Sequence, residues 1–80
     1  MTPQEIQHRL QLAFPQAEID TQGDDGRHFD VVIICDSFNG KTPISRHRMV
    51  YKALGDAMRA DIHALSITAL TQQEQTKTGA

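Results

Sequence analysis

Residues 36–67, DSFNGKTPISRHRMVYKALGDAMRADIHALSI, join two apolar segments of the chain and decide its fold. The Asn-Gly pair at residues 39–40 is typical of a turn, and the Thr-Pro pair at residues 42–43 is typical of a helix start. Gly55 weakens that helix or divides it into two. The stretch therefore predicts two helices between strands, and such a connection usually joins parallel strands by a right-handed crossover.

The segments before this stretch predict one helix and two strands. Residues 3–14 follow a capping box, carry apolar side chains at helical spacing and are followed by Pro15. Residues 17–22 alternate apolar and polar side chains, as a half-covered strand does. Residues 29–35 are largely apolar, so we expect a strand that is central in its sheet or covered on both faces. A turn rich in glycine and aspartate separates the two strands, which favours an antiparallel hairpin.

The segments after it predict a third strand at residues 62–70 and a polar, frayed tail at residues 71–80, with at most a helical turn at residues 72–75. The predicted order is αββααβ. We expect a single α+β domain over residues 1–80, in which three helices cover one face of a three-stranded mixed sheet in two layers.

Size and composition restrict the function. The chain has 80 residues, a formal net charge of −2 and one cysteine, Cys35. So short a domain has little room for an enclosed active site, and no nucleophile elbow, phosphate-binding glycine loop or pair of catalytic carboxylates is present, so we expect no enzymatic activity. A lone cysteine fits a reducing compartment, and the chain lacks both a long apolar run and a signal-peptide pattern. We expect a soluble cytoplasmic protein that binds no membrane.

Two histidines are the candidate metal ligands. His63 lies where the third predicted strand begins, and His28 lies where the second begins. Because the starts of parallel strands meet at one end of a sheet, the two histidines are expected at the same end. Each could equally be an ordinary surface histidine bonded to nearby backbone. Two histidines do not complete a metal site, so another molecule would have to supply the remaining ligands.

The helical part of the stretch is basic. Its side chains could form a stripe for nucleic acid, a docking face for an acidic protein, or simply a solvated helix face. We assign Arg46, Arg48, Lys52 and Arg59 to this surface, whereas His47 falls toward the apolar side of the helix and is expected to pack there. Cys35 ends an apolar strand and is expected to be a buried small hydrophobic residue.

Three motifs together resemble the BolA family. They are SFNG at residues 37–40, RHRMVY at residues 46–51 and IHALSI at residues 62–67. The resemblance extends over about residues 2–72 and is greatest to the short, IbaG-type bacterial branch. It implies a fold akin to the class II KH domain, in agreement with the order derived above.

The resemblance also implies a partner and a cofactor. BolA-like proteins pair with monothiol glutaredoxins of the CGFS type, and the pair shares a bridging [2Fe–2S] cluster. The glutaredoxin and glutathione supply thiolates, and the motif position of the BolA histidine is His63. A second ligand comes from the loop between the first two strands, where His28 is the candidate. We expect the isolated chain to be a monomer without a cofactor, and the pair to be a heterodimer that serves iron–sulfur or iron homeostasis or the stress response.

The alternative function is DNA-binding transcription regulation through the two helices and their basic stripe. Some BolA-like proteins are described in this way. The GxxG loop with which KH domains grip nucleic acid is not found between the helices, where residues 54–57 read LGDA. Salt-sensitive DNA binding would distinguish this alternative from the cluster-binding hypothesis.

Overall fold

The computed structural model describes residues 1–60 and 64–79, and the predicted αββααβ order is confirmed in it. Its elements are α1 (Pro3–Ala13), β1 (Glu18–Gln22), β2 (His28–Ile34), a short 3-10 turn η1 (Asp36–Phe38), α2 (Pro43–Leu54), α3 (Ala57–Ala60), β3 (Ala64–Leu70) and α4 (Gln72–Gly79). No helix within the described ranges is long and apolar enough to cross a lipid bilayer.

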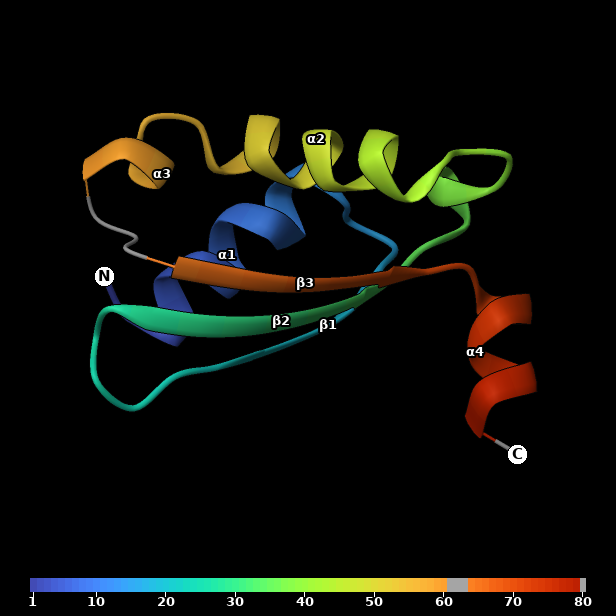
Figure 1. Cartoon of the computed structure of the whole chain (residues 1–80), viewed down its shortest axis with the longest axis horizontal. Coiled ribbons are helices and arrows are strands. Elements are labelled where there is room, and N and C mark those ends of the chain that lie inside the picture. Colours follow the sequence, from blue (N-terminus) through green and yellow to red (C-terminus); the bar gives the residue numbers. More distant parts are fainter. Residues whose placement is uncertain (61–63, 80) are drawn as a thin grey trace.

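The three strands form one mixed sheet in the order β1-β2-β3. β1 and β2 pair antiparallel, with Ile19 opposite Ile33. β2 and β3 pair parallel, with Val31 opposite Ile67. The chain passes from β2 to β3 through α2 and α3, as Figure 1 shows. The mixed sheet and the parallel connection inferred from residues 36–67 are therefore confirmed.

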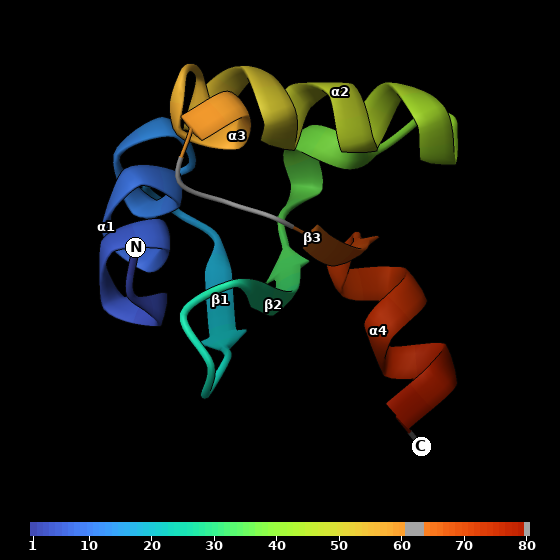
Figure 2. The same ribbon diagram turned by 60° about the vertical axis from the view of Figure 1, so that its left-hand side comes forward.

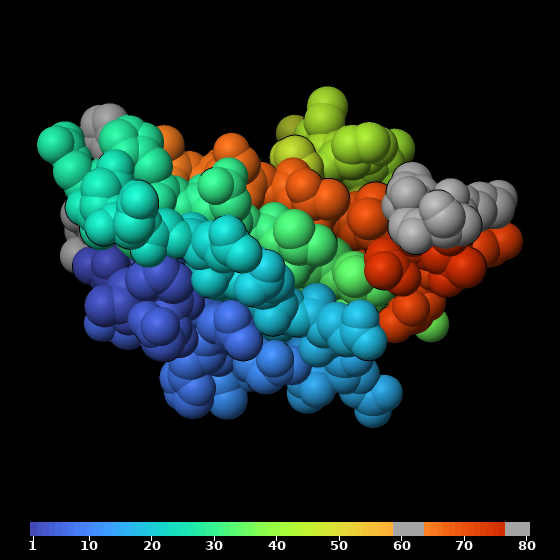
Figure 3. Space-filling model, turned by 90° about the horizontal axis from the view of Figure 1, so that it is seen from below, coloured from blue at the N-terminus to red at the C-terminus, as the bar shows by residue number. Residues whose placement is uncertain are grey.

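The helices α1, α2 and α3 cover one face of the sheet (Figure 2). The strands are visible across the opposite face, which these helices leave open (Figure 3). In β2, Phe29, Val31 and Ile33 are buried, while Asp30 and Val32 are exposed. β2 is central in the strand order. The alternative of a strand covered on both faces is wrong, because Asp30 and Val32 point to the face opposite the helices and are exposed.

Local hydrogen bonds explain where the two longer helices begin and end. The Oγ1 of Thr2 accepts a bond from the N–H of Glu5 at 3.1 Å, and the Oγ1 of Thr42 accepts one from the N–H of Ser45 at 3.1 Å. Both caps are followed by a proline in the first helical turn. Gly55 ends α2 with φ of 58°, a conformation that glycine adopts without steric cost.

The core lies between α1, α2 and the helix-facing side of the sheet. Its most deeply buried large side chains are Phe38, Ile6, Leu10, Ile33, Leu54, Val31 and Val50. On α2 the buried positions are Arg46, Val50 and Leu54, four residues apart. The spacing of the apolar residues in this helix also predicts Ile44 and Tyr51 on the buried side, but these side chains are 66% and 40% exposed. The inward stripe of α2 therefore starts with an arginine.

Arg46 is the main correction to the predicted basic surface, because it is buried, with 9% of its surface exposed. Its Nε donates to the carbonyl of Lys41 at 2.9 Å, and its Nη1 donates to the carbonyl of Ala69 at 3.0 Å. Nη1 and Nη2 also bond the two carboxylate oxygens of Glu74 at 2.6 and 3.1 Å. Arg46 thus joins α2, β3 and α4, and it is not part of a docking face.

The C-terminal segment forms α4, a longer helix than the turn expected at residues 72–75. Thr71 and Glu74 make a reciprocal cap: the N–H of Thr71 donates to Glu74 Oε1 at 2.9 Å, and the N–H of Glu74 donates to Thr71 Oγ1 at 3.2 Å. This Thr-x-x-Glu spacing is a helix-start signal that was present in the sequence. The segment lacks an apolar stripe, so a longer helix was not expected there. Polar contacts join α4 to the domain, from Arg46 to Glu74 and from the N–H of Gln72 to Asp36.

The contact with Arg46 makes the protein's stability depend on pH. Hydrogen bonds from the Arg46 side chain and the Thr71 N–H lower the pKa of Glu74 from 4.5 to about 2. Because the folded state holds this carboxyl ionised more firmly than the unfolded state does, its stabilising effect is complete above pH 4.5 and is lost as the pH falls toward 2. Thermal unfolding followed stepwise across this range should show the loss. The Glu74→Gln variant should show a smaller loss than the wild type, and equal losses would contradict the assignment.

Candidate functional site

His28 is the first residue of β2 and lies at one end of the sheet. Its partner in the parallel register is Ala64, the first residue of β3, and the N–H of Ala64 donates to the carbonyl of Arg27 at 3.1 Å. The β1–β2 loop and the start of β3 therefore lie side by side (Figure 1). The expectation that the two strands start at the same end is confirmed. His63 precedes Ala64 in the sequence but is outside the described residues, so its role as a ligand stays a prediction.

Asp25 holds both the backbone of the β1–β2 loop and the ring of His28. Its Oδ1 accepts bonds from the N–H groups of Arg27 and His28 at 2.9 and 2.8 Å. Its Oδ2 lies 2.7 Å from Nδ1 of His28. The bond from the His28 ring, followed by the two backbone bonds, holds the pKa of the Asp25 carboxyl well below its usual range. Asp25 is therefore a carboxylate at neutral pH and a strong acceptor for the imidazole.

Asp25 was not among the site residues predicted from the sequence. It lies beside Asp24 in a turn, and either carboxylate could have been simply solvated. The signal that could have distinguished them is spacing: an aspartate side chain commonly caps the backbone N–H two residues later. Asp25 stands two residues before Arg27 and three before His28, so its two oxygens reach backbone and ring together.

Gly23 lets the loop pack closely against the start of β2. A Cβ atom at Gly23 would lie 2.8 Å from the carbonyl oxygen of His28 and 2.7 Å from Cδ1 of Phe29. Phe29 is buried and anchors this end of β2 in the core. A side chain at position 23 would therefore displace the strand end that carries His28.

The described donor atoms fit one ligand position of a shared metal site. Within residues 1–60 and 64–79, no three histidine, cysteine or carboxylate side chains gather closely enough to hold a metal ion. His28 is 59% exposed at its side chain and could be reached by a partner. An imidazole whose Nδ1 faces a carboxylate is the arrangement seen in many histidine metal ligands, where the other nitrogen coordinates. His28 therefore has one ring nitrogen held by a carboxylate and a side chain exposed to solvent.

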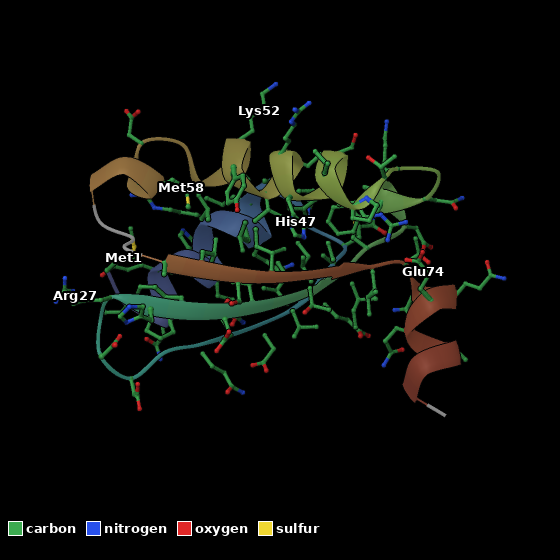
Figure 4. All side chains as sticks on the ribbon, viewed as in Figure 1. Met1, Arg27, His47, Lys52, Met58 and Glu74 are labelled. Carbon is green, nitrogen blue, oxygen red and sulfur yellow. The ribbon has the colours of Figure 1, made fainter. Side chains whose placement is uncertain are left out.

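The remaining predicted basic residues lie on a different surface. Arg48 and Lys52 are exposed on α2, one helical turn apart, and Tyr51 is 40% exposed next to Lys52. Lys52 points away from the sheet in Figure 4, whereas His47 points from α2 toward β3 and is half-buried, as expected. Arg59 belongs to α3, and its side chain lies outside the described part of the chain.

The only cysteine of the sequence, Cys35, is buried with 8% of its surface exposed, in agreement with the prediction of a small core residue. It follows β2 and contributes to the same hydrophobic core as Phe38. A buried thiol in apolar surroundings is unreactive, so it is a poor candidate for a ligand or nucleophile.

The fold, with its αββααβ order of elements and a histidine at the shared start of two parallel strands, is that of a small BolA-like domain, and the comparison with known families agrees. Residues 6–74 match the family described as BolA-like protein. The chain belongs to the BolA family.

Relatives and solved structures extend this finding. The chain is 47% identical over 53 residues to SufE-like protein 1 of Arabidopsis thaliana. This match covers 65% of the chain but only 14% of the Arabidopsis protein. It is 29% identical over 83 residues to the DNA-binding transcriptional regulator BolA of Escherichia coli K12, covering 92% and 79% of the two chains. The structure of a bolA protein homologue from Coxiella burnetii is 38% identical, with a TM-score of 0.84 over 95% and 97% of the two chains.

Proposed function

We propose that this protein is a non-enzymatic adaptor that pairs with a monothiol glutaredoxin of the CGFS type to bind or transfer a [2Fe–2S] cluster. The observation that carries the proposal is the position of His28. Its ring is held by Asp25 at the end of the sheet where β3 begins. The first residue of β3 directly follows His63 in the sequence. The side chain of His28 is 59% exposed, so the ligands of a partner can reach it.

In this proposal each side supplies a different kind of ligand. His63 and His28 offer imidazole nitrogens, while the glutaredoxin and glutathione offer thiolates. A [2Fe–2S] cluster supplies a one-electron couple and a transferable iron–sulfur unit, and replacing thiolates by imidazoles raises its reduction potential. Each imidazole must be neutral to coordinate, so cluster retention should weaken in acid. The chain's own task is to hold the rings in place and to dock the partner, in support of iron–sulfur or iron homeostasis.

Replacing His63 by alanine should remove the histidine-ligated cluster from the complex. After anaerobic reconstitution with a monothiol glutaredoxin and glutathione, we expect an altered visible absorption and circular dichroism spectrum. Because even the loss of a residue that only supports a ligand weakens metal binding by about 10–100-fold, loss of the ligand should accelerate cluster loss at least ~10-fold. His28→Ala should produce a similar change.

His8→Ala is the matched control, because His8 is also an exposed histidine but lies on α1. Its complex should retain the wild-type spectrum. A wild-type spectrum and cluster lifetime in the His63→Ala complex would contradict the proposed function. A wild-type result for His28→Ala alone would remove only that residue from the ligand set.

DNA-binding regulation is the second candidate function. The exposed Arg48 and Lys52 lie on one helix beside the partly exposed ring of Tyr51, a combination of cations and an aromatic group that suits a nucleic acid. The Escherichia coli relative is named a DNA-binding transcriptional regulator.

If α2 contacts DNA, the Arg48→Ala/Lys52→Ala double variant should bind more weakly and should depend less on salt. Loss of two phosphate contacts is expected to reduce the slope of log affinity against log salt by about 2. Fluorescence anisotropy over a range of salt concentrations measures both quantities. Arg9→Ala, an exposed cation on α1, is the control. Unchanged affinity and slope in the double variant would exclude α2 as the DNA-binding surface.

A further inference from the structure

The carboxylate of Asp25 contacts His28 in a way that selects one form of the imidazole ring. Its Oδ2 lies 2.7 Å from Nδ1, a short distance typical of a hydrogen bond to a charged acceptor. A carboxylate can only accept, so Nδ1 must carry the proton. In the neutral ring the lone pair is then on Nε2, and Nε2 is the atom that can coordinate a metal.

The backbone fixes the direction of this contact. Oδ1 of the same carboxylate accepts the N–H groups of Arg27 and His28, so the carboxylate cannot rotate without breaking two further hydrogen bonds. His28 is also anchored from the other side, because β2 pairs with β3 from this residue onward. Both the backbone and the first ring nitrogen of His28 are therefore constrained in a segment that is otherwise exposed to solvent.

We propose that Asp25 is a positioning residue that holds His28 as the Nδ1–H tautomer and thereby makes Nε2 the cluster ligand. This inference rests on the proposed function, because it gives the His28 ligand its donor atom and its orientation. Asp25 does not touch the cluster in this arrangement. It acts through the ring, as carboxylates behind metal-bound histidines commonly do, where their loss costs about 10–100-fold in metal affinity.

The Asp25→Asn variant tests the inference with little disturbance of the loop. An asparagine keeps the Oδ1 that accepts the two backbone N–H groups, but it places an NH2 donor where Oδ2 stood. That donor favours the opposite tautomer, in which Nδ1 carries the lone pair and Nε2 the proton. Asp24→Asn is the matched control, because it removes the same charge one residue earlier and leaves the Asp25 carboxylate in place.

Two measurements are needed. In the protein without cluster, long-range nitrogen–proton correlation spectra at a pH where imidazole is neutral identify the tautomer of His28. We expect Nδ1–H in the wild type and in Asp24→Asn, and a shift toward Nε2–H in Asp25→Asn. In the complex with a monothiol glutaredoxin and glutathione, Asp25→Asn should lose its cluster about 10–100-fold faster than the wild type. In a His28→Ala background, the same change at Asp25 should have no further effect.

The outcomes separate this inference from the proposed function. An unchanged His28 tautomer in Asp25→Asn would overturn it, and so would a changed tautomer with a wild-type cluster lifetime. Neither result touches the proposed function, which is tested by the His63→Ala variant. Equal effects of Asp24→Asn and Asp25→Asn would also overturn it, since they would indicate loop charge rather than ring orientation.

Discussion

Replacing Phe38 by alanine is expected to lower the free energy of unfolding by about 3–5 kcal/mol, the usual cost of removing a fully buried phenylalanine. The side chain is 0% exposed, and its ring centroid lies 5.6 Å from that of Phe14, with the planes inclined at 49°. Alanine would remove both the buried surface and this ring contact and would leave a cavity beside Phe14 in the core. Small domains are stable by only about 5–15 kcal/mol, so much of the total would be lost.

Urea denaturation followed by circular dichroism measures this change. Leu12→Ala is the control, because Leu12 is a large apolar residue that is 71% exposed, and its loss should change stability by less than ~0.5 kcal/mol. Equal changes for the two variants would contradict the central place of Phe38 in the core. Phe38 is also part of the SFNG motif by which the chain resembles its family, so in this structure that motif contributes to the core.

Arg46→Ala is expected to destabilise the domain by about 2–4 kcal/mol, because it removes hydrogen bonds from a buried cation to two backbone carbonyls and a carboxylate. The carbonyls of Lys41 and Ala69 would lose this donor, and the carboxylate of Glu74 would lose the bidentate contact that joins α4 to the rest of the domain. Hydrogen exchange should therefore become faster at the backbone amides of α4 as well as in the domain as a whole.

Arg48→Ala provides the comparison, since Arg48 is two residues away on the same helix but exposed. It should change stability by no more than about 0.5 kcal/mol. Arg46→Lys should recover only part of the loss, because an ammonium group lacks the planar fork that reaches the carboxylate with two nitrogens. Full stability in Arg46→Ala would show that the buried contacts contribute nothing net. Arg27, which precedes His28, and Glu74 lie at opposite ends of the molecule in Figure 4. The contact between Arg46 and Glu74 is therefore distant from the loop that carries His28.

The ends of most elements could be predicted to within one or two residues. The strand expected at residues 29–35 is His28–Ile34, and the helix expected at residues 3–14 is Pro3–Ala13. These boundaries depend on caps, prolines and apolar periodicity, which act between residues close together in the chain. The parallel connection predicted that β2 and β3 start at the same end of the sheet. The position of His28 near the start of β3 could therefore be predicted, but its contact with Asp25 could not.

The basic run of residues 46–48 shows where such patterns stop being informative. Arg46 and Arg48 have the same side chain and lie two residues apart, yet one is buried and the other exposed. What distinguishes them is the carbonyl of Ala69 and the carboxylate of Glu74, which are 23 and 28 residues away from Arg46 in the chain. The same distant contacts hold α4 in a segment whose composition predicted fraying.

Residues 36–67 thus predicted the order of elements and the parallel pairing, because turns, caps and apolar spacing are local properties. Only the tertiary structure decided which charged side chains are buried and which remain exposed to a partner. Arg46 is bonded to Glu74 and is not part of the predicted docking surface, and Asp25 contacts the ring of the predicted ligand His28. A charged side chain takes its role from the groups that surround it, and those groups meet only when distant segments pack together.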